Sequence, residues 1–157
     1  QGIELDLLIN NAGIAIEENL GGWTAETFAR ILAVNTVGPA LVAQALAPLM
    51  KAGSLLVNIS SGLASMGLNI NPETGLDAYA ASKSALNMLT RRLAAKLEEC
   101  EVTVVCVDPG WVQTSMGGEE APLTVDQSVS GVTGLIHKLS IGQTGLFLNA
   151  NGDELPW

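Results

Sequence analysis

Several residue types that particular functions require are scarce in this chain. It has 7 basic residues against 16 acidic ones in 157 residues, and its net charge is −9. A surface that follows nucleic-acid phosphates needs clustered lysine and arginine. The local basic cluster consists of Arg91, Arg92 and Lys96. Glu98 and Glu99 follow it in the same predicted helix, so we interpret it as a solvated face with local charge pairs, and nucleic acid is not an expected partner.

Cysteine and histidine are also scarce. The cysteines are Cys100 and Cys106, and on one strand six residues would separate them by about 20 Å, beyond disulfide reach. We expect buried thiols in a reducing compartment, and hence a cytoplasmic protein. The single histidine, His137, is expected to be a surface or cap residue on a helix. The sequence predicts no metal site.

The first residues do not resemble a leader peptide, because neither an arginine-rich segment nor a charged segment followed by an apolar core is present. The chain begins with Gln1 rather than Met, which suggests a cut. The longest uncharged run, Ile31 to Met50, is long enough to span a bilayer, but it contains two prolines and two side-chain amides. We predict a buried helix there rather than a membrane span.

What the chain does have is apolar residues: 48% are hydrophobic and 15% are charged, which excludes global disorder. Four short aliphatic runs predict strands covered on both faces of a parallel sheet. These runs are Leu5–Ile9, Ser54–Ile59, Val102–Val107 and Leu146–Asn149. Segments with helical character alternate with them: Thr24–Met50, Ala78–Glu99 and Val125–Leu139. The alternation predicts a single α/β domain over residues 1–157.

In such a fold, right-handed crossovers would place the strands side by side and gather the loops at their carboxyl ends along one edge of the sheet. α/β proteins bind ligands at this edge. Polar residues follow three of the predicted strands: Asn10 and Asn11, then Ser60 and Ser61, then Asp108. The sequence therefore predicts a site at this edge.

The only tyrosine, Tyr79, precedes Lys83 by four residues in a segment with helical propensity, so both side chains should share one helix face. A simple surface pair would have the same spacing. Functionally, a nearby ammonium group favours the phenolate, so we expect Lys83 to lower the pKa of Tyr79 from its usual value of about 10. Tyr79 would then serve as a general acid and base near neutral pH.

Two further polar features have open interpretations. Ser60 and Ser61 could hydrogen-bond a substrate oxygen or simply begin a loop. Asn35 lies in the uncharged helix, where it either bends the helix or satisfies a buried polar group. Pro39, four residues later, would free the Asn35 carbonyl from its usual helical partner.

Five motifs resemble the short-chain dehydrogenase/reductase (SDR) family in order and approximate spacing. They are Asn10-Asn11-Ala12-Gly13, Val34-Asn35, Asn58-Ile59-Ser60-Ser61, Tyr79-x-x-x-Lys83 and Pro109-Gly110-Trp111-Val112-Gln113-Thr114. The ending, from Gly145 to Trp157, resembles the C-factor and sniffer-like carbonyl reductase branch, which suggests a complete carboxyl terminus.

This resemblance implies a Rossmann-like parallel sheet with flanking helices and a catalytic tetrad of Asn35, Ser61, Tyr79 and Lys83. Tyr79 would donate and accept the proton, while Lys83 would lower its pKa and hold the nicotinamide ribose. Ser61, rather than Ser60, would bind the substrate oxygen. Asn35 would maintain a water-linked proton relay.

The resemblance also implies an NAD or NADP cofactor, with NADP slightly favoured by the branch, and reversible hydride transfer between this cofactor and a carbonyl or alcohol substrate. Besides Tyr79 and Lys83, two groups of residues would contact the cofactor. Asn11, Ala12 and Gly13 would lie beside its adenosine side, and Pro109, Gly110, Val112 and Thr114 would line its nicotinamide end. The substrate would lie beneath residues 115–123, a segment that looks mobile. Trp111 and Met116 in this region could contact an apolar substrate, but single apolar residues near a loop more often pack, and we interpret them as packing residues.

The family's glycine-rich turn, Gly-x-x-x-Gly-x-Gly, does not occur in the sequence. In the family, the strand at Leu5–Asn10 is the fourth, so three strands and their helices would precede it, roughly 70 to 80 residues. The chain would cover about two thirds of such an enzyme. We therefore expect weak or no cofactor binding by this chain alone, an exposed sheet edge at Leu5–Asn10, and association of the isolated chain.

Two functions are compatible with these observations. The first is the carboxyl-terminal catalytic part of an NAD(P)-dependent carbonyl reductase or alcohol dehydrogenase, which would pair with further copies through the helices at 24–50 and 78–99. The alternative is a truncated protein that acts without turnover as a signalling or interaction module.

Overall fold

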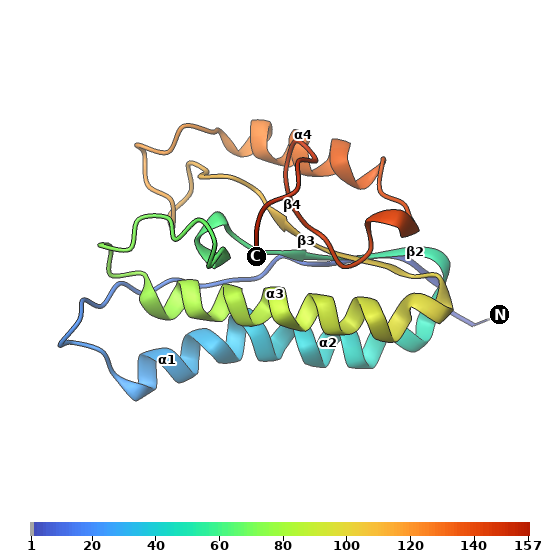
Figure 1. The fold of residues 1–157 in the computed structure, drawn as a ribbon, viewed down its shortest axis with the longest axis horizontal. Coiled ribbons are helices and arrows are strands. Elements are labelled where there is room, and N and C mark those ends of the chain that lie inside the picture. Colours follow the sequence, from blue (N-terminus) through green and yellow to red (C-terminus); the bar gives the residue numbers. More distant parts are fainter. Residues whose placement is uncertain (1) are drawn as a thin grey trace.

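The computed structural model describes residues 2–157, which form a four-stranded parallel sheet with helices on both faces (Figure 1). The strands are β1 (Leu5–Asn10), β2 (Met50–Ile59), β3 (Thr103–Asp108) and β4 (Phe147–Asn149). They lie in the order β1-β2-β3-β4, and each pairs in parallel with the next. The four predicted strands and their side-by-side order are confirmed.

The helices agree with the predicted segments, and side-chain caps begin two of them, α1 and α4. They are α1 (Ala25–Leu32), α2 (Gly38–Leu46), α3 (Asp77–Leu97) and α4 (Val125–Ile136). The Thr24 hydroxyl accepts a hydrogen bond from Thr27 N and begins α1. Thr124 and Gln127 form a reciprocal capping box that begins α4.

Alternate residues of the strands contact helices on opposite faces of the sheet. Leu56 and Val104 pack with α2 and α3, whereas Val57 and Val105 pack under α4. Figure 1 shows α4 on one side of the sheet and α1, α2 and α3 on the other. Because β2, β3 and β4 follow one another in the same direction across the sheet, the β2–α3–β3 and β3–α4–β4 crossovers have opposite hands. The expectation of right-handed crossovers throughout is therefore wrong.

The helix that the sequence predicts to be buried, at Ile31–Met50, is buried along only one stripe of its surface. Its regular part runs from Ala25 to Leu49 through a π-helical turn at Ala33–Val37. Its buried positions recur every four residues: Ile31, Asn35, Pro39 and Ala43. The helix is long and apolar enough to cross a membrane, and only 22% of its most apolar window is buried. The expectation of a buried helix is thus wrong for its outer face, and we interpret the stripe as packing against the α/β core.

The β1 side of the sheet is open. Within residues 2–157, β1 pairs with β2 alone. Ile9 is in register with Val57, so Ile9 and Leu7 face the side of the sheet that α4 covers farther along, and both side chains are 41% exposed. The expected exposed edge is confirmed, and the face of the sheet beside it is partly bare.

The two cysteines do not share a strand, as the sequence analysis had assumed. Cys106 is buried in β3, while Cys100 is exposed in the turn that precedes β3, and both are free. The expectation of two buried thiols is therefore wrong for Cys100. His137 is exposed at the carboxyl end of α4, where it caps the helix as predicted.

Candidate active site

The predicted site residues gather at the carboxyl ends of β1, β2 and β3, and a buried chain of polar groups fixes this edge. Asn10 Nδ2 donates to Asn58 Oδ1 over 2.8 Å, and Asn58 Nδ2 donates to the Thr90 hydroxyl over 2.8 Å. The chain joins β1, β2 and α3. The side chains of Asn10, Asn58 and Thr90 pair with one another through these hydrogen bonds. The ends of β1 and β2, where the following loops begin, are therefore held in place.

Asn35 reaches this edge from the π-helical turn. Its side chain is fully buried, and both ends of the amide pair with the Ile14 backbone at 2.8 Å. Its Nδ2 also donates to the Ser82 hydroxyl, which in turn donates to the Tyr79 carbonyl. The π turn and the buried contacts agree with both interpretations of Asn35, since the residue interrupts the regular helix and satisfies buried polar groups.

Tyr79 lies in the first turn of α3, and its environment differs from the expected one. Burial raises the pKa of its phenol, a hydrogen bond with the Ser61 side chain lowers it, and the charge of Asp108 raises it. The net direction is upward. Lys83 Nζ lies 5.7 Å from the centre of the Tyr79 ring. The expected net lowering of the Tyr79 pKa is wrong, because burial outweighs the lowering by the hydrogen bond with Ser61.

Lys83 is almost completely buried, at 3% exposure, and its Nζ donates to the Ile59 carbonyl over 2.8 Å. Burial lowers its pKa to about 8. An ammonium group carries three donors, so two remain beyond the bond to Ile59. A methyl group on Gly13 would lie 3.3 Å from Lys83 Nζ and 3.5 Å from Asn35 Oδ1. A side chain at position 13 would therefore press against this ammonium group and the Asn35 amide.

The two serines after β2 have different surroundings. The Ser60 hydroxyl is buried and donates to Asn87 Oδ1 over 2.6 Å. Ser61 is partly exposed, and its hydroxyl lies beside the Tyr79 phenol and accepts from Leu63 N. Ser60 is therefore occupied by the core, whereas Ser61 faces the edge where a ligand could bind.

The residues expected to contact a cofactor line the same edge. Asn11 and Ala12 are exposed after β1. Gly110 has a φ of +81°, and a side chain there would collide with Leu123, so glycine is required. The residues expected to contact a cofactor lie in the loops after β1 and β3: Asn11, Ala12, Gly13, Pro109, Gly110, Val112 and Thr114. The structure thus brings both predicted groups to one edge.

The segment over this edge is folded back on the chain. Val112 pairs with Leu123 in an isolated bridge, and the Gln113 side chain donates to the Ala121 carbonyl. The indole of Trp111 donates to the Gly117 carbonyl over 2.7 Å, yet Trp111 is 57% exposed and Met116 is 50% exposed. The interpretation of these two as packing residues is therefore wrong, and both offer apolar surface beside the site.

Two polar residues near Tyr79 were given no role from the sequence. Ser82 links the Asn35 amide to the Tyr79 carbonyl. The Asp108 carboxyl accepts from Gly110 N at 3.1 Å, and burial raises its pKa. Asp108 had been noticed only as a polar residue that ends a strand. Its electrostatic effect on Tyr79 depends on the packing of β3 against α3, which no local pattern encodes.

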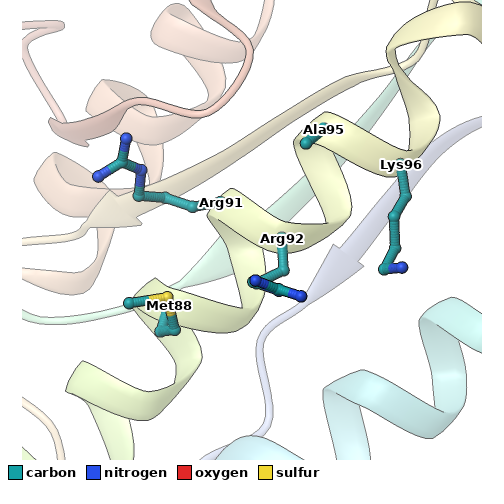
Figure 2. Close-up of a pocket in the computed structure, with 5 residues that line it drawn as sticks. All are labelled: Met88, Arg91, Arg92, Ala95 and Lys96. Carbon is teal, nitrogen blue, oxygen red and sulfur yellow. The ribbon is translucent and has the colours of Figure 1, made fainter.

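Apart from this site, the basic cluster lines a shallow hollow on α3. Five residues of α3 line it: Met88, Arg91, Arg92, Ala95 and Lys96 (Figure 2). The Arg91 guanidinium lies 5.1 Å from the centre of the Trp157 ring, on the opposite side of the helix from Arg92 and Lys96. Within residues 2–157 the salt bridges join Lys51 to Glu4 and Asp6. The expected pairing of this cluster with neighbouring glutamates is therefore wrong.

Within residues 2–157, no group of three or more possible metal ligands occurs.

Comparison with known proteins places these features in a family. The short chain dehydrogenase family matches residues 2–123. The C-signal of Myxococcus xanthus is 36% identical over 156 residues, which cover 98% of this chain and 93% of that protein.

Solved structures agree. The NADPH-bound carbonyl reductase from chicken fatty liver is 35% identical, with a TM-score of 0.92 over 99% of this chain and 67% of that chain. The carbonyl reductase Sniffer of D. melanogaster is 36% identical, with a TM-score of 0.91 over 98% of this chain and 67% of that one. These overlaps confirm the Rossmann-like fold, the resemblance drawn from the motifs, and the expectation that the chain spans about two thirds of such a reductase.

Proposed function

The chain belongs to the short-chain dehydrogenase family, and we propose that it is the catalytic, carboxyl-terminal part of an NAD(P)(H)-dependent oxidoreductase acting on a carbonyl or alcohol substrate. The single observation that carries the proposal is the meeting of Ser61, Tyr79, Lys83 and Asn35 at one edge of the sheet. Residues far apart in the chain converge there, and the side chains are of the types that hydride transfer with proton transfer requires.

The residues fit a nicotinamide cofactor. Two donors of the Lys83 ammonium group are free of the Ile59 carbonyl, and Gly13 leaves space beside Nζ. We propose that Lys83 and Tyr79 hold the ribose, and that the segment from Pro109 to Thr114 holds the nicotinamide end. When bound, the cofactor supplies or accepts the hydride. The chicken carbonyl reductase is NADPH-bound, which favours NADPH as the cofactor for the tests below.

Each proposed catalytic residue has one task. Ser61 donates a hydrogen bond to the substrate oxygen and orients it toward Tyr79. Tyr79 donates its proton to this oxygen during reduction and accepts it back during oxidation. The Asn35 side chain is held by the Ile14 backbone and keeps the π-helical turn in place. In this role it maintains a path by which protons exchange with solvent near Lys83. Trp111 and Met116 offer apolar contact to the substrate.

The test uses the chain extended by its missing βα units. Tyr79→Phe should abolish NADPH-dependent carbonyl reduction and leave NADPH binding intact, because only the proton donor is removed. Retained turnover in this variant would contradict the assignment.

Ser61 and Ser60 provide a matched pair. Ser61→Ala should reduce kcat by about 10²-fold or more, since the substrate oxygen loses its donor. Ser60→Ala removes the same hydroxyl from a neighbouring residue that bonds Asn87, so it should lower thermal stability and leave kcat largely unchanged. Equal kcat losses in both variants would argue against a specific role for Ser61.

We also propose that residues 1–157 form one partial domain, which lacks the βα units that bind the pyrophosphate. Without the glycine-rich turn and its helix N-terminus, much of the binding energy for the cofactor is lost. A fluorescence titration of the 157-residue chain with NADPH should therefore show weak or no binding. Micromolar affinity would contradict the partial-domain proposal.

One observation favours a second candidate function. The C-signal of Myxococcus xanthus is 36% identical, and this chain covers 93% of it, so a relative of similar length carries the name of a signal. A cytoplasmic enzyme and a signalling module differ in the mass of the native product. Intact-mass measurement on the protein from its source should give roughly 24 kDa for the complete enzyme, because the three further βα units would add roughly 70 to 80 residues. A mass of 16.3 kDa would favour the module.

A further inference from the structure

We propose that Asp108 is a positioning residue of this site: its carboxylate ties the loop that carries Ser61 to the turn after β3 and keeps a negative charge near Tyr79. This inference rests on the proposed function, because it gives Asp108 a part in holding the groups that would bind substrate and transfer the proton.

The geometry of the carboxyl group supports the tie. Asp108 is the last residue of β3, and its Oδ1 accepts from Gly110 N over 3.1 Å. The backbone amide of Gly62 also faces this carboxyl group. A methyl group on Gly62 would lie 3.3 Å from Asp108 Oδ2 and 3.1 Å from Ile70 Cδ1. The carboxyl group therefore lies between two backbone segments that belong to different strands.

These two segments hold opposite sides of the proposed site. Gly62 follows Ser61 directly, and it is buried, so a displacement of Gly62 moves Ser61 with it. Gly110 belongs to the turn that would line the nicotinamide end of the cofactor. A single carboxylate that accepts from Gly110 N and faces the amide of Gly62 would fix the spacing between these segments, because charge-assisted hydrogen bonds are stronger than neutral ones.

The charged and polar groups around Tyr79 come from α3, from the segment that follows β2 and from the end of β3. Lys83 lies on α3 with its Nζ 5.7 Å from the ring centre, Ser61 contributes a hydroxyl after β2, and Asp108 contributes a carboxylate at the end of β3. The buried Cys106 thiol on β3 stays neutral because burial raises its pKa to about 12. After burial itself, the Asp108 charge is the group that raises the pKa of Tyr79. The charge of Asp108 thus keeps Tyr79 protonated, and able to donate its proton, up to a higher pH.

A local turn is the competing explanation. The bond from Gly110 N to an aspartate two residues earlier is an Asx turn, which asparagine forms as well. An Asx turn alone would involve neither Gly62 nor Tyr79. Asp108→Asn keeps the turn and removes the charge, whereas Asp108→Ala removes both.

Tyr79 is the only tyrosine of the chain, so tyrosine labelled with ¹³C at Cζ gives one NMR signal. The fraction of phenolate is measured in the 157-residue chain at the highest pH at which circular dichroism remains native. Asp108→Asn should increase this fraction relative to the parent chain. Asp77→Asn, an equal charge change in the first turn of α3, should leave it unchanged. An unchanged or smaller fraction in Asp108→Asn, or an equal rise in Asp77→Asn, overturns the charge role.

Amide hydrogen exchange tests the tie. Asp108→Ala should accelerate exchange at both Gly62 and Gly110 by at least about tenfold relative to the Val57 amide in the strand core. Asp108→Asn should restore protection at Gly110. If only Gly110 responds to Asp108→Ala, Asp108 forms a local turn and the tie is wrong. Neither readout requires cofactor or turnover, so failure of this inference is distinguishable from failure of the proposed function.

Discussion

Strands β1 and β3 have the same length and similar apolar content, yet their burial differs. In β3, Val104, Val105 and Val107 are completely buried, whereas Leu7 and Ile9 in β1 are each 41% exposed. β3 has a strand on either side and helices over both faces, while β1 has one neighbouring strand and helical cover on one face. An apolar strand therefore becomes core only where neighbouring elements cover it.

The largest effect should come from a matched pair of leucines. Leu56→Ala in the covered part of β2 should cost about 2–5 kcal/mol of the free energy of unfolding, because a fully buried side chain is replaced by a cavity. Leu7→Ala on the open strand should cost less than about 1 kcal/mol. Urea denaturation of both variants measures the difference. Similar losses would mean that β1 is covered in solution.

Two lysines extend the comparison to charge. Lys83, on the covered side, has a pKa of about 8 instead of 10.5, so the unfolded state binds more protons between these values. Stability should therefore rise as the pH increases from 8 toward 10.5. Lys83→Met should remove this rise and raise stability at pH 7 by on the order of 1–3 kcal/mol.

Lys51 serves as the control for this experiment. It is exposed at the β1 edge and pairs with Asp6 over 2.9 Å, and this pairing raises its pKa. Lys51→Met should leave the rise in stability between pH 8 and 10 intact. Thermal melts of the parent chain and both variants across this pH range measure these effects. A flat profile in the parent chain would contradict a buried, partly deprotonated Lys83.

The open strand should also determine how the isolated chain associates. Ile9→Lys places a charge on the bare face and should weaken self-association at least about tenfold, since lysine on an edge opposes strand pairing. Val129→Lys, a similarly exposed position on α4, should leave association unchanged. Sedimentation velocity across a concentration series measures both. A parent chain that is already monomeric would contradict the expectation of association through β1.

The smallest effect on stability is expected on the outer face of α2. Leu41 is 57% exposed there, so Leu41→Lys should change the free energy of unfolding by no more than about 0.5 kcal/mol. In the extended chain the same change should disrupt the proposed pairing of copies through α1, α2 and α3. Size-exclusion chromatography with light scattering distinguishes these outcomes. An unchanged oligomer would exclude this face as the interface.

The predictable part of the fold was local. Aliphatic runs located β1 to β4, and the segments with helical character located α1 to α4, because strand and helix signals lie within a few neighbouring residues. The opposite hands of the α3 and α4 crossovers were not predictable, since the face that a helix covers depends on the packing of the complete sheet. The exposure of Cys100 was missed for the same reason.

The candidate site divides along the same line. By itself, the sequence determined the family and the residues that converge, because motif order and spacing are properties of the chain. Only the tertiary structure decided that burial raises the pKa of Tyr79 and lowers that of Lys83. It also decided that Ser60 bonds Asn87 while Ser61 faces the edge of the sheet. The position of Asp108 near Tyr79 was likewise set by folding. Burial and charge at a site depend on groups that are brought close by folding, and these distances are not written in the linear order of residues.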